Sequence, residues 1–290
     1  MEYDAVNIHW FPGHMMKTLR LIAADVKNVD LVIELLDARI PASSKNPELA
    51  ALIAGKPQLL LLNKSDLADP QATKRWLAAY RESGYGAIAV TAKDRALRKS
   101  CVDAANALIA EKLAREKERG AVARVPRAMV VGVPNVGKST LINSLAGGAY
   151  TRTEDRPGVT RGKQWISAPG IELLDMPGVL GRKFDDPDTG LKLAFTGAIK
   201  DDVFDREQVA ACLLAILAKR YPAQLKERFK MSDGQLAGEG WQLLEAAARN
   251  RGMLLGRGEY DTARAAAAVL DELRAGKLGR ITFEEPENGL

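Results

Sequence analysis

The chain of 290 residues has little cysteine: only Cys101 and Cys212 are present, 111 positions apart. It contains no Cys-x-x-Cys pair and no group of cysteine and histidine at metal-binding spacing. The sequence therefore argues against a disulfide framework and against a structural zinc site, and it suits a reducing compartment.

Long hydrophobic runs are also missing. The longest wholly apolar run, residues 209–218, has ten residues, whereas a membrane-spanning helix needs about 20. The first ten residues carry acidic side chains and lack the basic and apolar stretches of a secretory signal. We therefore expect a cytoplasmic protein with no membrane contact.

An excess of acid is absent as well, since the net charge is +5. Residues 1–185 hold 27 basic and 20 acidic side chains, and residues 186–290 hold 15 and 17, so the basic excess lies in the first part. This distribution is compatible with a polyanionic partner such as RNA and equally with an ordinary soluble surface.

Short apolar segments alternate with segments of helical spacing in the first part of the chain. The expected strands are residues 31–37, 58–62, 87–90, 128–131, 163–167 and 171–174. Helical spacing is clearest in residues 70–83 and 95–119. This alternation predicts an α/β fold, a mostly parallel sheet with helices on both faces, whose ligands bind beyond the carboxyl ends of the strands.

The amino-acid composition and the spacing of apolar residues change after residue 185. The chain becomes rich in alanine and leucine, with helical spacing in residues 207–220, 240–251 and 262–275. We predict an α/β domain over residues 1–185 and a small all-helical domain over residues 186–290.

The sequence GVPNVGKS at residues 132–139 fits the phosphate-binding P-loop, G-x-x-x-x-G-K-[ST]. It follows an expected strand and precedes an expected helix, so backbone amides and the helix N-terminus can converge on phosphates. Lys138 is expected to reach the β- and γ-phosphates, and Ser139 to bind Mg²⁺. The predicted nucleotide contacts here are Asn135, Val136, Gly137, Lys138, Ser139 and Thr140.

Two later segments complete a phosphate site. Asp175-Met-Pro-Gly178 ends a strand 37 residues after Lys138, where the acid can hold Mg²⁺ through water and Gly178 can donate its amide to the γ-phosphate. Between them, Thr160 lies in a loop where its hydroxyl could close on Mg²⁺ only when the γ-phosphate is present. An ordinary exposed loop is the alternative for that segment.

A guanine site is predicted by Asn63-Lys64-Ser65-Asp66, which fits N-K-x-D. A carboxylate at Asp66 can accept from both the ring N–H and the amino group of guanine, whereas adenine would leave it unpaired. Asn63 would brace the loop, and the stem of Lys64 would cover the base. Thr91-Ala92-Lys93, after the next strand, would supply an amide to the guanine carbonyl.

These base motifs precede the phosphate loop, which is the reverse of the usual order. The same sheet forms if the chain is opened elsewhere and the old ends are joined, here through residues 95–127. The segment around Asp175 then runs directly into the helical domain, which suggests that nucleotide state is conveyed to that domain mechanically.

This order, with Asp37-Ala-Arg-Ile-Pro41 ahead of the base motif, resembles the circularly permuted GTPases. The segments WFPGHM (residues 10–15), PGVTRGKQW (157–165) and GKLGR (276–280) are similar to members that act in ribosome assembly. The resemblance covers nearly the whole chain. It implies a permuted P-loop GTPase domain followed by a small helical domain.

The resemblance also implies a function. Such proteins bind the large ribosomal subunit and its rRNA late in assembly and couple GTP hydrolysis to maturation or release, with stimulation by the particle and by potassium. We expect Mg²⁺ as cofactor and a monomeric protein. One departure from the family is Val159, where threonine is common.

The residue that orients the hydrolytic water is not obvious, because Val179 follows the D-x-x-G segment where Ras-like proteins have glutamine. The resemblance assigns this role to His14, and a structural hydrogen-bonding role is the alternative. Asn135 is either a potassium ligand, again by resemblance, or a simple loop hydrogen-bonding group.

Two rival functions remain at this stage. One is an RNA-binding module that holds GTP only for stability, and the other is a kinase or ATPase built on the same P-loop. Residues 249–280 contain seven basic and four acidic side chains, so one helical face could contact rRNA, with Glu284 and Glu285 pointing away. A solvated helix surface explains this composition equally well.

Overall fold

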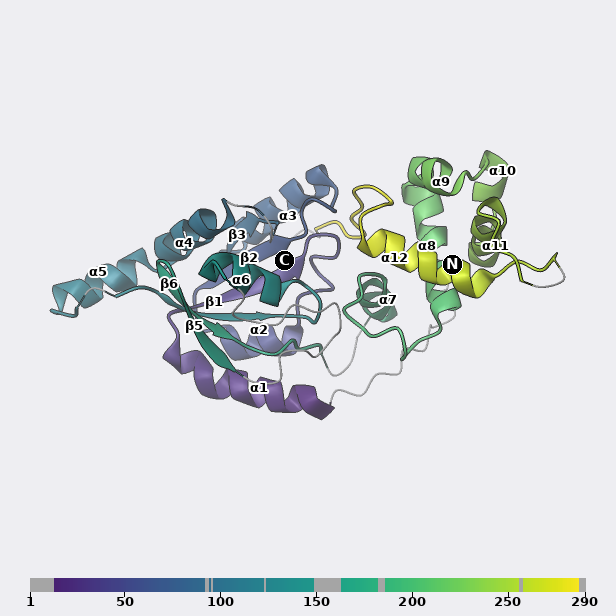
Figure 1. The fold of residues 1–290 in the computed structure, drawn as a ribbon. Coiled ribbons are helices and arrows are strands. Elements are labelled where there is room, and N and C mark those ends of the chain that lie inside the picture. The colour runs from purple at the N-terminus through teal and green to yellow at the C-terminus, as the bar shows by residue number, and fades with distance from the viewer. Residues whose placement is uncertain are drawn as a thin grey trace. The chain divides into compact units, whose positions relative to one another are not determined.

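The structure, a computed structural model, describes residues 13–91, 94, 96–122, 124–148, 163–181, 186–255 and 258–286, without the side chains of His14 and Pro187. These residues form two compact units (Figure 1). The α/β unit contains described residues 13–181 together with 282–286, and the helical unit contains residues 186–281.

A six-stranded sheet is the centre of the α/β unit, in the order β3-β2-β1-β4-β6-β5. Its strands are β1 Leu31–Asp37, β2 Gln58–Asn63, β3 Gly86–Ala89, β4 Arg127–Gly132, β5 Gln164–Ala168 and β6 Ile171–Asp175. All neighbours are parallel except β5, which lies antiparallel to β6 at one edge. The expected mostly parallel sheet is confirmed, and β1 is buried at every position, as a central strand covered on both faces must be.

Helices cover both faces of this sheet. Trp76 and Tyr80 pack against Leu60 on one face. On the other face, Leu59 lies beside Leu108, and successive strand residues point to opposite faces. The helices of the unit are α1 Gly13–Asp25, α2 Pro47–Ile53, α3 Pro70–Glu82, α4 Leu97–Leu108, α5 Ala110–Glu118 and α6 Lys138–Ala146, with a 3₁₀ turn, η1, at Val26–Asn28. Helices α3 and α4 therefore cover opposite faces of the sheet.

The single helix expected over residues 95–119 is two helices. Its first part, α4, buries Leu97, Cys101 and Ala105, whereas α5 buries none of its residues. The break falls at Ile109, whose backbone (φ −116°, ψ 14°) is not helical. The apolar stripe stops here, so no packing keeps α5 in line with α4.

Glu34, in the middle of β1, is the least expected residue of the core. Its side chain is fully buried, and its carboxylate oxygens have no hydrogen-bond partner among the described residues. Desolvation raises the pKa of Glu34 to about 7, against the opposing charge of Lys45. Folding therefore favours the protonated acid.

This burial predicts a pH-dependent stability. The folded protein keeps the Glu34 proton up to about pH 7, whereas the unfolded chain loses it near pH 4.5, so stability is lost as pH rises through this window. One pKa unit corresponds to about 1.4 kcal/mol, so Glu34→Leu should be more stable than the wild type by up to about 3 kcal/mol at pH 8. Urea unfolding at several pH values measures this difference, whose pH-dependent part should vanish near pH 4. Equal profiles for the two proteins would contradict it.

The helical unit consists of six helices in the described residues: α7 Pro187–Phe195, α8 Arg206–Arg220, α9 Pro222–Phe229, α10 Asp233–Leu236, α11 Gly240–Asn250 and α12 Thr262–Arg274. The apolar run expected from the sequence forms the buried side of α8, which packs against α11 and α12. Asp205 caps α8 by accepting from the amides of Glu207 and Gln208. None of the helices in the described ranges has the length and apolarity that a bilayer crossing requires.

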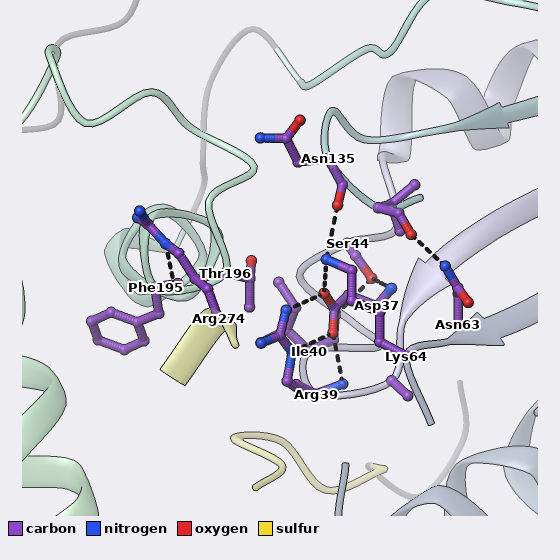
Figure 2. A network of polar contacts seen from close by, with 12 residues as sticks. Asp37, Arg39, Ile40, Ser44, Asn63, Lys64, Asn135, Phe195, Thr196 and Arg274 are labelled. Carbon is purple, nitrogen blue, oxygen red and sulfur yellow. Dashed lines mark hydrogen bonds and ion pairs between the residues drawn. The ribbon is translucent and has the colours of Figure 1, made fainter. Parts of the chain in front are cut away.

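Basic side chains of the helical unit are partly used inside it. Arg251 pairs with Glu272 at 2.6 Å, and Arg274 pairs with Asp201 at 2.7 Å. Arg274 also donates to the carbonyl oxygen of Phe195, which joins α12 to the end of α7 (Figure 2). These two arginines of the basic stretch 249–280 therefore stabilise the unit itself, which reduces the cations available to a partner.

Residues 282–286, which we call the C-terminal strap, differ from the expected domain boundary because they pack on the α/β unit. The amide of Phe283 donates to the carbonyl oxygen of Arg39 at 2.8 Å, and the indole of Trp76 donates to the carbonyl oxygen of Glu284 at 3.1 Å. The carboxylate of Glu284 accepts hydrogen bonds from the loop after β1. The acidic end expected to point away is instead a structural part of this unit.

Candidate functional site

The P-loop lies between β4 and α6, and its glycines are required by geometry. Gly132 and Gly137 have φ of +148° and +102°, which side chains rarely adopt. A Cβ at Gly132 would lie 2.6 Å from the carbonyl oxygen of Leu35. The loop therefore turns tightly into the N-terminus of α6, where backbone amides and the helix dipole favour phosphate. Ser139 and Thr140 lie in the first turn of that helix.

Lys138 and Asp175 are buried together at this loop. The Lys138 ammonium donates to the carbonyl oxygens of Gly132 and Val133 at 3.2 and 3.3 Å. Desolvation lowers the pKa of Lys138 to about 8, while the charge of Asp175 opposes that shift. The loop carbonyls are thus weak partners for a cation that phosphate oxygens would bind more strongly.

Asp175, 1% exposed at the end of β6, has no hydrogen-bond partner for either carboxylate oxygen among the described residues. Desolvation raises its pKa to about 6, against the nearby charge of Lys138. A buried carboxylate without partners is costly, and a hydrated divalent cation would satisfy it. The residues present therefore fit Mg²⁺ on the P-loop side of β6, although no cluster of three or more metal-ligating side chains occurs in the described part of the chain.

The segment after Asp175 approaches the P-loop closely. A Cβ at Gly178 would lie 3.0 Å from the Cα of Pro134, so only glycine fits here without displacing the loop. The Val179 amide donates to the carbonyl oxygen of Gly132, and the Val179 side chain is fully buried. This position supplies neither a polar group nor solvent access for water activation.

Helix α1 begins beside the same segment. The sulfur of Met15 accepts a hydrogen bond from the amide of Leu180 at 3.3 Å. His14 precedes Met15 on α1, but its side chain lies outside the described residues. Met15, the residue after His14, therefore contacts Leu180, which lies two residues beyond the D-x-x-G segment.

The base motif is bonded directly to the P-loop. At the end of β2, the side-chain amide nitrogen of Asn63 (Nδ2) donates to the carbonyl oxygen of Val136 at 2.7 Å. The ammonium of Lys64 donates to the carbonyl oxygen of Asn135 at 2.8 Å (Figure 2). Lys64 and Asn135 both have positive φ, +58° and +55°, so each is held in a strained backbone conformation. Segments about 70 residues apart in sequence thus form one site.

Ser65, Asp66 and Thr91 join the two base-recognition segments. The Ser65 hydroxyl donates to the carbonyl oxygen of Val90 at 3.0 Å, and the Thr91 hydroxyl donates to a carboxylate oxygen of Asp66 at 3.2 Å. Asp66 is exposed, so its carboxylate is accessible to a ligand. Ala92, Lys93 and Thr160 lie outside the described residues.

The sequence did not single out Asp37 and Arg39 as functional residues. Arg39 donates to both carboxylate oxygens of Asp37, at 2.9 and 2.7 Å, and Lys64 lies 3.2 Å from the same carboxylate. Desolvation would raise the pKa of Asp37, but the charges of Arg39 and Lys64 hold it well below its usual range. The available signal was an acid at the end of a mostly apolar strand, two residues before an arginine.

Several known proteins are similar to this chain. A family model described as 50S ribosome-binding GTPase matches residues 127–232. Ribosome biogenesis GTPase A of Bacillus cereus is 46% identical over 281 residues, which cover 97% of this chain and 94% of that protein. The protein of the same name from Priestia megaterium is 44% identical over 283 residues, which cover 97% and 98%.

Solved structures show the same architecture. GDP-bound TM YlqF matches with a TM-score of 0.69 at 28% identity, covering 93% of this chain and all of that one. GNP-bound YlqF from T. maritima matches with a TM-score of 0.66 at 27% identity, covering 94% and 99%. The fold is thus that of a circularly permuted P-loop GTPase, and the chain is a GTP-hydrolysing enzyme. It belongs to the ribosome biogenesis GTPase A family.

Proposed function

We propose that this GTPase acts late in assembly of the large ribosomal subunit, where it binds the particle and its rRNA and couples GTP hydrolysis to maturation or release. The relatives named for ribosome biogenesis and the family model named for 50S binding support this role. The protein would work in the cytoplasm as a monomer.

One observation carries the proposal. The base motif is hydrogen-bonded to the P-loop, and the segment after Asp175, which approaches the P-loop, continues along the chain into the helical unit. Asn63 and Lys64 donate hydrogen bonds to carbonyl oxygens of the P-loop. A nucleotide that contacts either segment therefore affects the position of both. Residues 176–181 follow Asp175 and lead along the chain toward α7. Loss of the γ-phosphate would release Gly178 and let this segment move, which is a direct route to the helical unit.

In this proposal Lys138 binds the β- and γ-phosphates, and Thr91, Ala92 and Lys93 complete the guanine site begun by Asp66. Mg²⁺, which neutralises developing phosphate charge, would be held by Ser139, by Thr160 and, through water, by Asp175. Asn135 is assigned to K⁺, because its side-chain carbonyl is a ligand suited to a hard cation. Hydrolysis with and without K⁺ tests that assignment, which fails if Asn135→Ala keeps the K⁺ effect.

The test of the biological role is GTP hydrolysis in potassium buffer with purified large subunits, small subunits or neither. Stimulation by large subunits alone, together with co-sedimentation in the GTP-bound form, is the expected result. Equal rates in all three reactions would refute the particle as partner. They would favour an RNA-binding module that holds GTP for stability.

His14 is proposed to accept a hydrogen bond from the attacking water. The buried Val179 cannot, and the contact between Met15 and Leu180 supports placing His14 near the phosphate site. Because general acid–base groups contribute about 10²–10⁴-fold, His14→Ala should lower particle-stimulated kcat by at least about a hundredfold and leave GTP affinity unchanged. Single-turnover hydrolysis measures this change, with His9→Ala as the matched control. Full activity of His14→Ala would assign the histidine a structural role only.

A further inference from the structure

The ammonium of Lys64 is held from two sides. On one side it donates to the carbonyl oxygen of Asn135 in the P-loop at 2.8 Å. On the other it lies 3.2 Å from a carboxylate oxygen of Asp37, which ends strand β1 (Figure 2). The Lys64 side chain is 24% exposed, whereas that of Asp37 is 3% exposed, so the lysine is partly open to a ligand and its counter-ion is not.

The position of Asp37 is itself strongly determined. Its carboxylate accepts from the backbone amide of Arg39 at 3.0 Å and from the guanidinium on both oxygens. Its own amide donates to the hydroxyl of Ser44 at 3.0 Å. A carboxylate with so many fixed partners cannot rotate to follow a moving lysine, so the lysine must come to it.

Lys64 needs such a constraint for two reasons. Its backbone is left-handed (φ +58°), which is unfavourable for a lysine and persists only where the surroundings impose it. A long lysine stem also has many rotamers, and freezing them on binding a ligand costs affinity. A lysine already fixed between β1 and the P-loop avoids that cost.

We propose that Asp37 is a positioning residue of the nucleotide site, which holds Lys64 in the conformation that covers the guanine base and links the base motif to the P-loop. The inference rests on the proposed assignment of residues 63–66 to the base. Asp37 touches no nucleotide in this scheme, and it acts through Lys64 alone.

The alternative is that Asp37 only neutralises Arg39, which is 1% exposed and buried against it. In that case removing the carboxylate would weaken the fold, and its effect on nucleotide affinity would not depend on Lys64. A double-mutant cycle separates the two cases, because residues that act through one another give non-additive effects.

The experiment measures the dissociation constant and dissociation rate of fluorescent GDP for wild type, Asp37→Asn, Lys64→Met and the double variant. We expect Asp37→Asn to weaken GDP binding about tenfold or more, mainly through faster dissociation, since charge-assisted hydrogen bonds are the stronger ones. In the Lys64→Met background the same change should have almost no further effect. Equal losses in both backgrounds would overturn the proposal, as would an unaltered affinity of Asp37→Asn.

Asp30 provides a matched control at the other end of β1. It is also a buried aspartate, 5% exposed, and it pairs with Arg124 and Lys112. Asp30→Asn should lower stability without changing GDP affinity.

If Asp37→Asn fails to fold, the variant Asp37→Asn/Arg39→Met removes both buried charges and leaves neither unpaired. It should show the same loss of affinity, and wild-type binding by this variant would overturn the proposal. Wild-type protein that binds no GDP would instead refute the nucleotide site itself, so the two failures are distinguishable.

Discussion

Asp66→Asn is expected to lower the affinity for GTP by about a thousandfold and to raise the affinity for xanthosine triphosphate, in which a carbonyl replaces the guanine amino group. In the proposed guanine site the carboxylate accepts two N–H groups of the base, whereas an asparagine amide offers a donor where guanine also donates. A polar group left unpaired on binding accounts for an effect of this size. Xanthine, with its extra carbonyl acceptor, matches the asparagine donor.

The structure supports a fixed orientation for this carboxylate. Thr91 donates to Asp66 at 3.2 Å, and Ser65 is bonded to the carbonyl oxygen of Val90, so both segments hold the loop in place. Competition between GDP and xanthosine diphosphate for the wild type and the variant measures the change.

Asp69, three residues further on, is the matched control for this exchange. It caps α3 by accepting from the amides of Gln71 and Ala72. Asp69→Asn should therefore keep the preference for guanine. An Asp66→Asn variant that still prefers GDP as the wild type does would place the base elsewhere.

Glu284→Ala should lower the free energy of unfolding of the α/β unit by about 2–4 kcal/mol. The Glu284 carboxylate accepts from the amide of Ala42 at 2.7 Å and from the amide and hydroxyl of Ser43. These donors belong to the loop that leads from Asp37 to α2, and Glu284 is 7% exposed. Without the carboxylate, buried backbone amides lose their hydrogen-bond partner. The free-energy penalty of leaving them unpaired is larger than the net stabilisation that the hydrogen bonds provide.

The neighbouring Glu285 is the control for this effect, since it pairs with Arg75 at 2.8 Å where both side chains are about half exposed. Exposed pairs contribute little, so Glu285→Gln should change stability by less than about 0.5 kcal/mol. Denaturant unfolding of the nucleotide-free variants compares the two. Equal stabilities of Glu284→Ala and Glu285→Gln would show that the strap does not stabilise the loop.

Local sequence predicted much of the fold because the signals are local. The mostly apolar β1 and the P-loop between strand and helix could be recognised from fewer than ten residues each, and structure and comparisons confirm the fold class. The break at Ile109 was missed because helical spacing does not show whether a helix has a surface to pack on. The strap was missed because residues 282–286 have no periodicity of their own, and they are ordered by contacts more than 200 positions away.

The sequence by itself determined the motifs that this protein carries: a phosphate loop, a carboxylate that we propose recognises guanine, and an order of motifs typical of the permuted GTPases. Each of these features depends on residue types at short spacing in the sequence, and this information is present before the chain folds. Only the tertiary structure decided that Asp37 holds Lys64, that Asn63 braces the P-loop and that Glu284 secures the loop after β1. These are contacts between segments distant in sequence, and they depend on which strands become neighbours. The order of the strands is decided by the burial of the whole sheet and not by any single motif.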